Sequence, residues 1–399
     1  MSSHRKSLKI LVVGGGMYVL GRGFENHGTV LPAIFEFSRN FEVLELIVCT
    51  TSVKSCDLVV DKYNELSKLM KCEIKLFVYP KTKSDDKAYI HAAKMHKPDA
   101  AIVSVPDHLH EPIGLDLINL GIHILMVKPL SDSYQGAKRL CNAASDHNVI
   151  AQVEFHKRLD ESNMLMRDAV RSGKIGMPLY ATVEYSQQKK IPRDVFKTWS
   201  DKTNIFQYLG VHYVDIIYYV TGFMPKIVTA WGQSVYLSGM GINTYDAMQV
   251  VVEWDNLEGG NFVSTHITNW IDPDETSAMS DQKINIVGSK GRYQADQKNR
   301  GVESVFDGDQ SRHVNPYFCQ PICSINDRLE YVGYGIKSIY QFLEDVVRHK
   351  INDDSFKGLS ESRPSFEQAL ISSSVIDAAK RSIENGSTKE LCLYEKESA

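Results

Sequence analysis

The chain has 399 residues, of which 43% are hydrophobic and 24% charged, and its formal net charge is −4. This length allows two domains, each with its own core. Acids and bases are mixed along the chain, which provides no basic surface for nucleic acid or for an anionic membrane, and we expect neither as a partner.

The targeting and cysteine patterns predict a reduced, cytoplasmic protein. The N-terminal apolar run is too short for a signal peptide and leads directly into glycines, and no stretch approaches the length of a membrane span. The seven cysteines are odd in number and scattered, a pattern typical of intracellular proteins. Cys319 and Cys323 have no second Cys or His pair at zinc spacing, so we expect no metal site.

Strands and helices alternate over the first third of the chain. Apolar runs predict buried strands at residues 8–13, 41–49, 73–78, 100–105, 122–127 and 149–153. Helical segments lie between most of them, at residues 54–70, 85–94, 108–120 and 132–146. Alternation of this kind predicts an α/β fold with a doubly wound parallel sheet.

A glycine triplet follows the first of these strands. Gly14 and Gly16 would let the backbone approach a pyrophosphate at a helix N-terminus, although a plain tight turn is the alternative. Val19 stands in the place of the third glycine of the usual fingerprint. The position after the first strand of a βαβ pattern favours the dinucleotide interpretation. We therefore predict a dinucleotide-binding Rossmann domain over residues 1–153.

Further glycines interrupt the segment where the first helix of such a sheet should lie, at Gly21, Gly23 and Gly28. The helix is therefore expected to begin near Thr29, with Pro32 in its first turn. The long connection before it forms either a flap over the cofactor or substrate or a solvent-exposed insertion, and both interpretations have similar weight.

The second strand ends without the acidic residue that usually binds the adenosine ribose. Its end carries the hydroxyls of Thr50, Thr51 and Ser52, followed by Lys54. This composition leans mildly toward the 2′-phosphate of NADP. The same hydroxyls could bond a free ribose, so NAD stays open.

Lys128 ends the apolar strand at 122–127 and is followed at once by a proline. A buried amine must be paired or must lower its pKa. At the carboxyl end of a strand in an open α/β sheet, the side chain would point into the crevice where ligands bind. The alternative is an edge lysine whose ammonium reaches water.

The alternation stops after residue 153, and residues 154–399 predict a second domain. Helices are expected at 157–172, 205–221, 336–349 and 365–384. Strands are expected at 179–186, 227–236, 247–254, 261–268, 283–287 and 292–295. A Gly259-Gly260 turn suggests antiparallel pairing. This order predicts an α+β domain with a large, mainly antiparallel open sheet.

The helix at 205–221 is nearly all apolar except for one polar face. Tyr208, His212 and Asp215 are spaced i, i+4 and i+7, which places them on that face. Polar groups on a buried helix must be satisfied by protein or by ligand. A core histidine bonded to an aspartate is one interpretation, and an acid/base set facing a cofactor crevice is the other.

Seven short motifs occur in an order and spacing that resemble one family. They are VVGGGM (12–17), SVPDHLH (104–110), GIHILMVKPL (121–130), VEFHKR (153–158), SGKIG (172–176), LGVHYVD (209–215) and IVGSKG (286–291). Over nearly its whole length the chain resembles the Gfo/Idh/MocA family of NAD(P)-dependent oxidoreductases. That resemblance implies a Rossmann domain followed by an α/β domain that binds substrate and whose open sheet often forms the interface of a homo-oligomer, a dimer or tetramer.

The resemblance also implies roles for individual residues. Lys128 matches the lysine of a Glu-Lys-Pro motif beside the nicotinamide, and His212 matches the histidine of an Asp-x-x-x-His acid/base motif. The implied cofactor contacts are Gly14, Gly16, Met17, Thr50, Thr51, Ser52, Ser104, Pro106, His110 and Lys128. His156, Arg158, Trp199 and Asp215 are candidate substrate-binding residues, although plain structure is the stronger interpretation of the first three and Asp215 is expected mainly to orient His212 or cap local structure.

Two departures from the family motifs stand out. Val127 replaces the motif glutamate, so any pairing of that acid with Lys128 is expected to be absent. Tyr208 stands where the aspartate would be, and a phenol can exchange a proton when a cation lowers its pKa. Tyr208 and His212 are therefore both candidate proton acceptors, and Lys128 is expected to stabilise developing alkoxide charge.

The function implied is hydride transfer between NAD or NADP and a hydroxyl or carbonyl carbon of a small molecule. The expected substrate is a sugar, a nucleotide sugar or a cyclitol. A catalytically silent dinucleotide-binding regulator of the same fold is the alternative, because Val127 and Tyr208 replace motif acids.

Overall fold

The computed structural model describes residues 7–22, 26–255, 261–324, 328–351 and 359–394. Gly23 and the Gly259-Gly260 turn lie outside these ranges. Contacts divide the chain into two compact units. The first contains Met1–Leu130, Gly136–His156 and Tyr317–Gln368, and the second contains Ser131–Gln135, Lys157–Pro316 and Ala369–Ala399. The roles assigned to residues 1–153 and 154–399 stay predictions.

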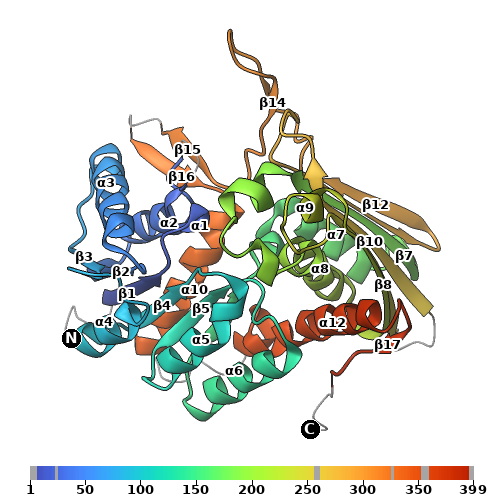
Figure 1. Cartoon of the computed structure of the whole chain (residues 1–399), viewed down its shortest axis with the longest axis horizontal. Coiled ribbons are helices and arrows are strands. Elements are labelled where there is room, and N and C mark those ends of the chain that lie inside the picture. The colour runs from blue at the N-terminus through green and yellow to red at the C-terminus, as the bar shows by residue number, and fades with distance from the viewer. Residues whose placement is uncertain (1–6, 23–25, 256–260, 325–327, 352–358, 395–399) are drawn as a thin grey trace. The chain divides into compact units, whose positions relative to one another are not determined.

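Six parallel strands form the sheet of the first unit (Figure 1). They are β1 (Ser7–Val13), β2 (Glu42–Cys49), β3 (Leu76–Tyr79), β4 (Ala100–Val103), β5 (His123–Val127) and β6 (Ala151–Glu154). Their order is β3-β2-β1-β4-β5-β6. The order reverses between β1 and β4, which is the point where open α/β sheets bind ligands. The predicted doubly wound parallel sheet is confirmed.

Both faces of this sheet carry apolar side chains, so helices cover both. Its core includes buried side chains of α2 (Val30–Phe37), α3 (Val53–Met70) and α10 (Tyr334–Ile351), together with alternate residues of β1 and β2. The intervening strand residues Leu11 and Ile47 are equally buried and point to the opposite face. The strands also contact α4 (Ala88–His96) and α5 (His110–Ile118), the latter preceded by the short turn η2 (Asp107–Leu109).

The first helix of the sheet is broken, as the glycines predicted. A single turn, α1 (Met17–Leu20), ends at Gly21, whose φ of 73° is left-handed. A Cβ at that position would lie 2.0 Å from the carbonyl oxygen of Asn26, so only glycine fits. The regular helix begins at Val30 with Thr29 as N-cap, which confirms the predicted start.

A segment from late in the chain belongs to the first unit and was not predicted there. It contains the hairpin β15 (Gln320–Cys323) and β16 (Leu329–Val332), then α10 and α11 (Leu359–Ser362). Tyr331 attaches the hairpin, because its hydroxyl lies 2.8 Å from Nδ1 of His27 and its N–H donates to Oε1 of Glu36 at 2.7 Å. These contacts join residues about 300 positions apart, which local patterns cannot indicate.

The second unit contains a seven-stranded mixed sheet. In chain order its strands are β7 (Pro178–Gln188), β8 (Met224–Gln233), β9 (Ala247–Asp255), β10 (Asn261–Asp272), β11 (Ser280–Gly288), β12 (Gly291–Asp296) and β17 (Glu390–Leu391). The order is β12-β11-β7-β10-β9-β8-β17, and only the β7–β10 pairing is parallel within these strands. The predicted large, mainly antiparallel sheet is confirmed.

Helices of the second unit include α7 (Glu161–Arg171), α8 (Val211–Thr221) and α9 (Tyr236–Gly239). The predicted helix at 205–221 is only partly regular: residues Phe206–Gly210 form a π turn before α8. The other short elements of this unit are a π turn at Ile191–Val195, η5 (Ser200–Lys202), β13 (Glu303–Ser304) and β14 (Arg312–His313). Three helical elements contain residues of both units, namely α6 (Tyr134–Asp146), η3 (His156–Leu159) and α12 (Phe366–Glu384).

Among the helices of the described ranges, none is long and apolar enough to cross a membrane. All seven cysteines are unbridged.

Candidate active site

The glycine turn follows β1 at the switch point of the first sheet. Gly14 has a φ of 120°, and a Cβ there would lie 2.0 Å from the carbonyl oxygen of Ser104. The Gly14 N–H donates to the carbonyl of Cys49 at 2.8 Å, and the Ser104 N–H donates to Val13 at 2.9 Å. The turn is therefore fixed between the ends of β2 and β4.

Gly16 has a different environment from Gly14. A Cβ at Gly16 would meet no atom within 4 Å, so the backbone on this side of the turn is open. An open glycine backbone at the switch point is the feature that a dinucleotide pyrophosphate requires. Val19, in place of the third glycine, is fully buried in the core. These residues fit a dinucleotide, with Gly14, Gly16 and Met17 as the part of the chain that would hold its pyrophosphate.

The hydroxyls after β2 differ in their availability. Thr50 is buried and donates from Oγ1 to the carbonyl of Ser52 at 3.0 Å. Ser52 is the N-cap of α3, where its Oγ accepts from the Ser55 N–H at 3.2 Å. Thr51 and Lys54 are exposed. Thr51 and Lys54 therefore present their polar ends to solvent, whereas Thr50 and Ser52 also support the local structure.

The loop after β4 is tied to the turn after β5 by His110. This side chain is fully buried, and its Nδ1 lies 2.7 Å from the carbonyl oxygen of Pro129 while its Nε2 lies 2.9 Å from that of Val105. Burial lowers the pKa of His110, and the Asp107 carboxylate opposes this shift. His110 therefore positions the turn that carries Lys128, and Ser104 and Pro106 lie in the same loop.

Lys128 follows the last residue of β5 and is 8% exposed. Burial lowers its pKa to about 8, and the carboxylates of Asp107 and Glu154 oppose the shift. Position 127 is a valine and supplies no carboxylate to Lys128, whereas two carboxylates from neighbouring segments, Asp107 and Glu154, act on the lysine. An amine with this pKa can exchange a proton near neutral pH.

Glu154 ends β6, and its Oε2 lies 2.8 Å from Nδ1 of His156. The His156 ring stacks on Tyr334 with centroids 5.6 Å apart and on Tyr18 with centroids 6.3 Å apart. Phe318 packs against the same ring at 5.2 Å. His156 was predicted to bind substrate; the structure places it in the first unit, 8% exposed, among these aromatic rings.

In the second unit, Tyr208 and Trp199 belong to one aromatic cluster. Tyr208 lies in the π turn, with its ring centroid 4.9 Å from that of Phe196, 6.1 Å from Trp199 and 5.7 Å from Trp270. Tyr208 and Trp199 are partly exposed, whereas Phe196 and Trp270 are buried. The aromatic packing fixes the orientation of the Tyr208 ring and leaves part of its surface accessible.

His212 and Asp215 lie on α8, about one and two turns beyond Tyr208, and both are buried. Asp215 forms a bidentate ion pair with Arg158, with Oδ2–Nε of 2.8 Å and Oδ1–Nη2 of 2.6 Å. Burial raises the pKa of Asp215, and Arg158 opposes the shift. The structure thus brings together two predicted substrate-binding residues, Arg158 and Asp215, as partners of each other.

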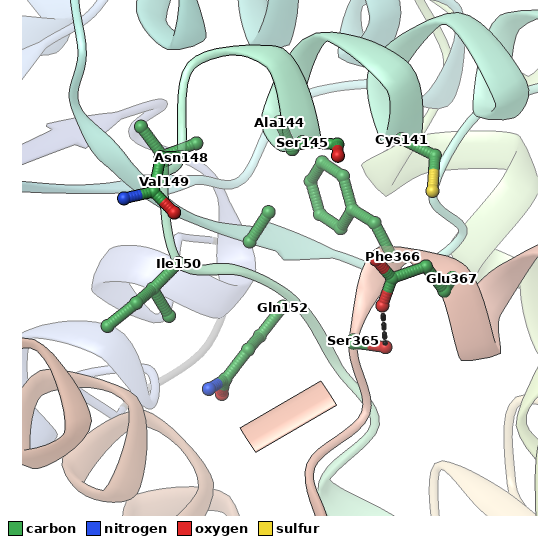
Figure 2. Close-up of a pocket in the computed structure, with 11 residues that line it drawn as sticks. Cys141, Ala144, Ser145, Asn148, Val149, Ile150, Gln152, Ser365, Phe366 and Glu367 are labelled. Carbon is green, nitrogen blue, oxygen red and sulfur yellow. Dashed lines mark hydrogen bonds between the residues drawn. The ribbon is translucent and has the colours of Figure 1, made fainter. Parts of the chain in front are cut away.

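Figure 2 shows a small cavity in the first unit, of about 130 Å³, that contains none of the predicted site residues. It lies between the end of α6 and the segment at Ser365–Glu367, where Ser365 donates from Oγ to Oε2 of Glu367 at 3.1 Å. A second hollow lies beside His123 and His349. Within the described ranges, no group of three or more His, Cys, Asp and Glu side chains could hold a metal ion.

Sequence reasoning missed several residues around Lys128 and His156. Asp107 lies in the SVPDHLH motif, in which only Ser104, Pro106 and His110 were predicted to have a role, and Glu154 lies one residue past the predicted strand. Tyr18, Phe318 and Tyr334 gave no signal, because nothing in the sequence joins residue 18 to residues 318 and 334. An acid immediately after a strand at the same sheet edge as a lysine is the signal that could have identified Glu154.

Comparison with known families identifies the chain. Residues 8–155 match the model described as an oxidoreductase family with an NAD-binding Rossmann fold, and residues 164–294 match the GFO/IDH/MocA C-terminal domain. The two matches cover well over half of the chain. The protein belongs to the Gfo/Idh/MocA oxidoreductase family.

Among curated relatives, the chain is 24% identical over 212 residues to an inositol 2-dehydrogenase of Rhizobium meliloti, covering 53% of this chain and 61% of the relative. It is 25% identical over 173 residues to a Bacillus subtilis NADP(+)-dependent scyllo-inositol 2-dehydrogenase, covering 41% and 46%. A levoglucosan dehydrogenase of Pseudarthrobacter phenanthrenivorans is 24% identical over 151 residues, covering 37% and 38%. Each alignment spans less than two thirds of the relative.

Solved structures match over almost the entire chain. The scyllo-inositol dehydrogenase of Lactobacillus casei, solved with NAD(H) and scyllo-inositol, has a TM-score of 0.67 at 14% identity, covering 98% of this chain and 100% of its own. The myo-inositol 2-dehydrogenase of Lactobacillus plantarum has a TM-score of 0.66 at 16% identity, covering 97% and 100%. At these identities the likeness shows a shared fold.

Proposed function

We propose that this protein is an oxidoreductase that transfers a hydride between NAD or NADP and a hydroxyl or carbonyl carbon of a sugar, a nucleotide sugar or a cyclitol. The observation that carries the proposal is Lys128, a buried lysine with a pKa lowered to about 8, at the same sheet edge as the open glycine turn. The dehydrogenase names of the relatives support this class of substrate.

A bound nicotinamide would supply a hydride acceptor or donor at its ring. Lys128 would then stabilise negative charge on the substrate oxygen, because a fixed ammonium in a water-poor site interacts strongly with a developing alkoxide. His212 or Tyr208 would accept the hydroxyl proton. Tyr208 and His212 are both candidates for this role, because each side chain carries a group that can take part in proton transfer.

NADP is the cofactor that the residues after β2 favour. Thr51 and Lys54 are exposed there, and a lysine can bind a 2′-phosphate as a point charge. Thr50 is engaged with the backbone of Ser52, so the exposed pair is the better candidate for this contact.

The cofactor assignment predicts binding of NADH or NADPH, detected as a change in nicotinamide fluorescence. Substituting Gly16→Asp should raise the dissociation constant at least tenfold, equivalent to about 1.4 kcal/mol, because a carboxylate would repel the pyrophosphate. The fold should persist, since Gly16 is an N-cap with open space around it and aspartate is a favoured N-cap.

Gly239→Asp is the matched control, because Gly239 also has no atom within 4 Å of a built Cβ but lies in α9 of the second unit. It should bind like the parent protein. If the parent protein binds neither NADH nor NADPH, both the enzyme hypothesis and the silent-regulator hypothesis are wrong. Binding without turnover of any polyol or sugar would favour the regulator.

We also propose that the protein is a homo-oligomer that associates through the open sheet of the second unit. One face of that sheet carries exposed apolar side chains on three strands, including Tyr180, Trp231 and Ile267, which are 45%, 43% and 42% exposed. Exposed apolar residues gathered on one sheet face are typical of an interface between subunits.

This assignment predicts a dimer or tetramer by size-exclusion chromatography with light scattering. Ile267→Glu should convert it to smaller species, because a charge would be buried at the centre of the interface. Leu69→Glu is the control, since Leu69 is 45% exposed on α3 in the first unit, and it should leave the mass unchanged. A monomeric parent protein would exclude this proposal.

A further inference from the structure

Lys128 is a buried cation whose own motif lacks an acid. In a buried environment an ammonium is favoured only by nearby negative charge and by hydrogen bonds. The neighbouring residue that could have supplied this charge is Val127. The charge must therefore come from other segments of the first unit.

The strand register brings Glu154 to the sheet edge occupied by Lys128. In the parallel ladder between β5 and β6, Val127 is the direct partner of Glu154. Glu154 therefore occupies on β6 the position that the missing acid would occupy on β5. Its side chain is 1% exposed, so its charge is poorly screened by solvent and acts strongly on nearby groups.

The orientation of Glu154 is fixed by His156. Nδ1 of the imidazole lies 2.8 Å from Oε2 of the carboxylate, and the imidazole is itself stacked with Tyr334 and packed against Phe318. Oε1 makes no hydrogen bond of ordinary geometry among the described residues, and the Tyr18 hydroxyl is the donor that faces the carboxylate. A buried carboxylate is costly unless donors and a cation lie nearby, and Lys128 is a cation on which this carboxylate acts.

Other titratable groups also act on this pair. Asp107, 3% exposed at the start of η2, also acts on Lys128, and His110 faces Asp107 and Lys128. Tyr18 faces Glu154, and burial together with the Glu154 carboxylate raises the pKa of the Tyr18 phenol well above its ordinary value. Tyr18 is therefore neutral at physiological pH, so from that side Glu154 meets a hydroxyl donor and no positive charge.

We propose that Glu154 is a positioning residue for Lys128 and supplies from β6, together with Asp107, the negative charge that Val127 does not supply from β5. His156 and its aromatic neighbours hold the carboxylate in place. The catalytic meaning of this arrangement rests on the proposed function, whereas the interaction of the two side chains does not. Glu154 thus keeps the lysine charged and oriented for its role at the substrate.

The test is a titration of Lys128 followed by NMR of lysine side chains in isotope-labelled protein without nucleotide. The Lys128 signal is assigned by its absence in Lys128→Met. Glu154→Gln keeps the shape and a hydrogen-bonding oxygen but removes the charge, and it should lower the pKa of Lys128 by about 1 unit or more, as expected for loss of an opposite charge within several ångströms. Glu344→Gln, in the exposed pair with Arg348, should leave it unchanged.

A charge-relocation variant tests whether position or structure is responsible. Val127→Glu combined with Glu154→Gln returns the acid to β5 and should restore most of the Lys128 pKa. If Glu154→Gln folds normally and leaves the Lys128 pKa unchanged, the proposal is overturned. If Glu154→Gln does not fold, the single variant Val127→Glu decides, because it should raise the Lys128 pKa and an unshifted value overturns the proposal.

Activity provides an independent readout of the same interaction. The alkaline limb of the kcat/KM profile should move to lower pH in Glu154→Gln by the amount that the NMR titration shows. A protein that binds no nucleotide would contradict the proposed function, yet the NMR titration would still decide whether Glu154 acts on Lys128.

Discussion

Lys128→Met should lower kcat/KM by about 10²- to 10³-fold and leave the dissociation constant for the nicotinamide cofactor within about threefold of the parent value. The range is that for removal of one preorganised group that stabilises an oxyanion. Methionine keeps the length and apolar stem of lysine, so the buried site stays filled. Steady-state kinetics and fluorescence titration of NADH or NADPH measure the two quantities.

Lys68→Met is the matched control, because Lys68 lies exposed on α3 in the same unit. It removes the same charge from the surface and should leave kcat/KM and cofactor binding unchanged. An undiminished rate in Lys128→Met would exclude the lysine from the chemistry. Equal loss of rate and of cofactor binding would instead assign Lys128 to binding of the nucleotide.

The titration of Lys128 gives this assignment a second signature. The pKa is lowered from 10.5 to about 8, so the folded protein loses this proton before the unfolded chain does. Between pH 8 and 10.5 the unfolded state binds more protons, and this residue therefore makes unfolding less favourable as pH rises. Activity that needs the ammonium should fall over the same range. The opposite movement of rate and stability distinguishes loss of charge from alkaline unfolding.

The parallel sheet could be predicted because its signal is local. Buried strands such as β1 are nearly continuous apolar runs. The turn after β1 requires glycine for a steric reason, and the position of the glycines directly after the strand already indicates this turn. The late start of α2 could be predicted from nearby glycines and from Pro32, which are also local signals. These features depend on residues that are adjacent in the chain.

The surroundings of Lys128 could be predicted only in part. The lysine itself was identified from its strand, but Glu154 reaches it through strand register, and Phe318 and Tyr334 reach His156 from a segment more than 150 residues away. The π turn at Phe206–Gly210 is a further example, because its sequence has an ordinary helical pattern. Long-range pairing, which single-sequence patterns do not encode, decides each of these features.

Breaking the Arg158–Asp215 ion pair should cost the second unit about 3–5 kcal/mol of unfolding free energy. Both side chains are buried and their contact is bidentate, and removal of one partner leaves the other as an uncompensated buried charge. Arg158→Met should therefore be strongly destabilising at neutral pH in urea or thermal unfolding. Its effect should shrink as pH falls, because the stranded Asp215, whose pKa burial already raises, can then take up a proton.

A double-mutant cycle separates this structural role from the substrate-binding role predicted for the same residues. Asp215→Leu combined with Arg158→Met removes both charges and should recover much of the stability lost in either single variant, a non-additivity of several kcal/mol. The exposed pair Arg348–Glu344 is the control cycle and should couple by about 0.5 kcal/mol or less. Additive effects for Arg158 and Asp215 would contradict the pair as a stabilising unit. A stable double variant with a higher KM for substrate and an unchanged kcat would show that Arg158 and Asp215 bind substrate as well. A stable double variant with an unchanged KM would show that the pair holds α8, and with it His212, in place.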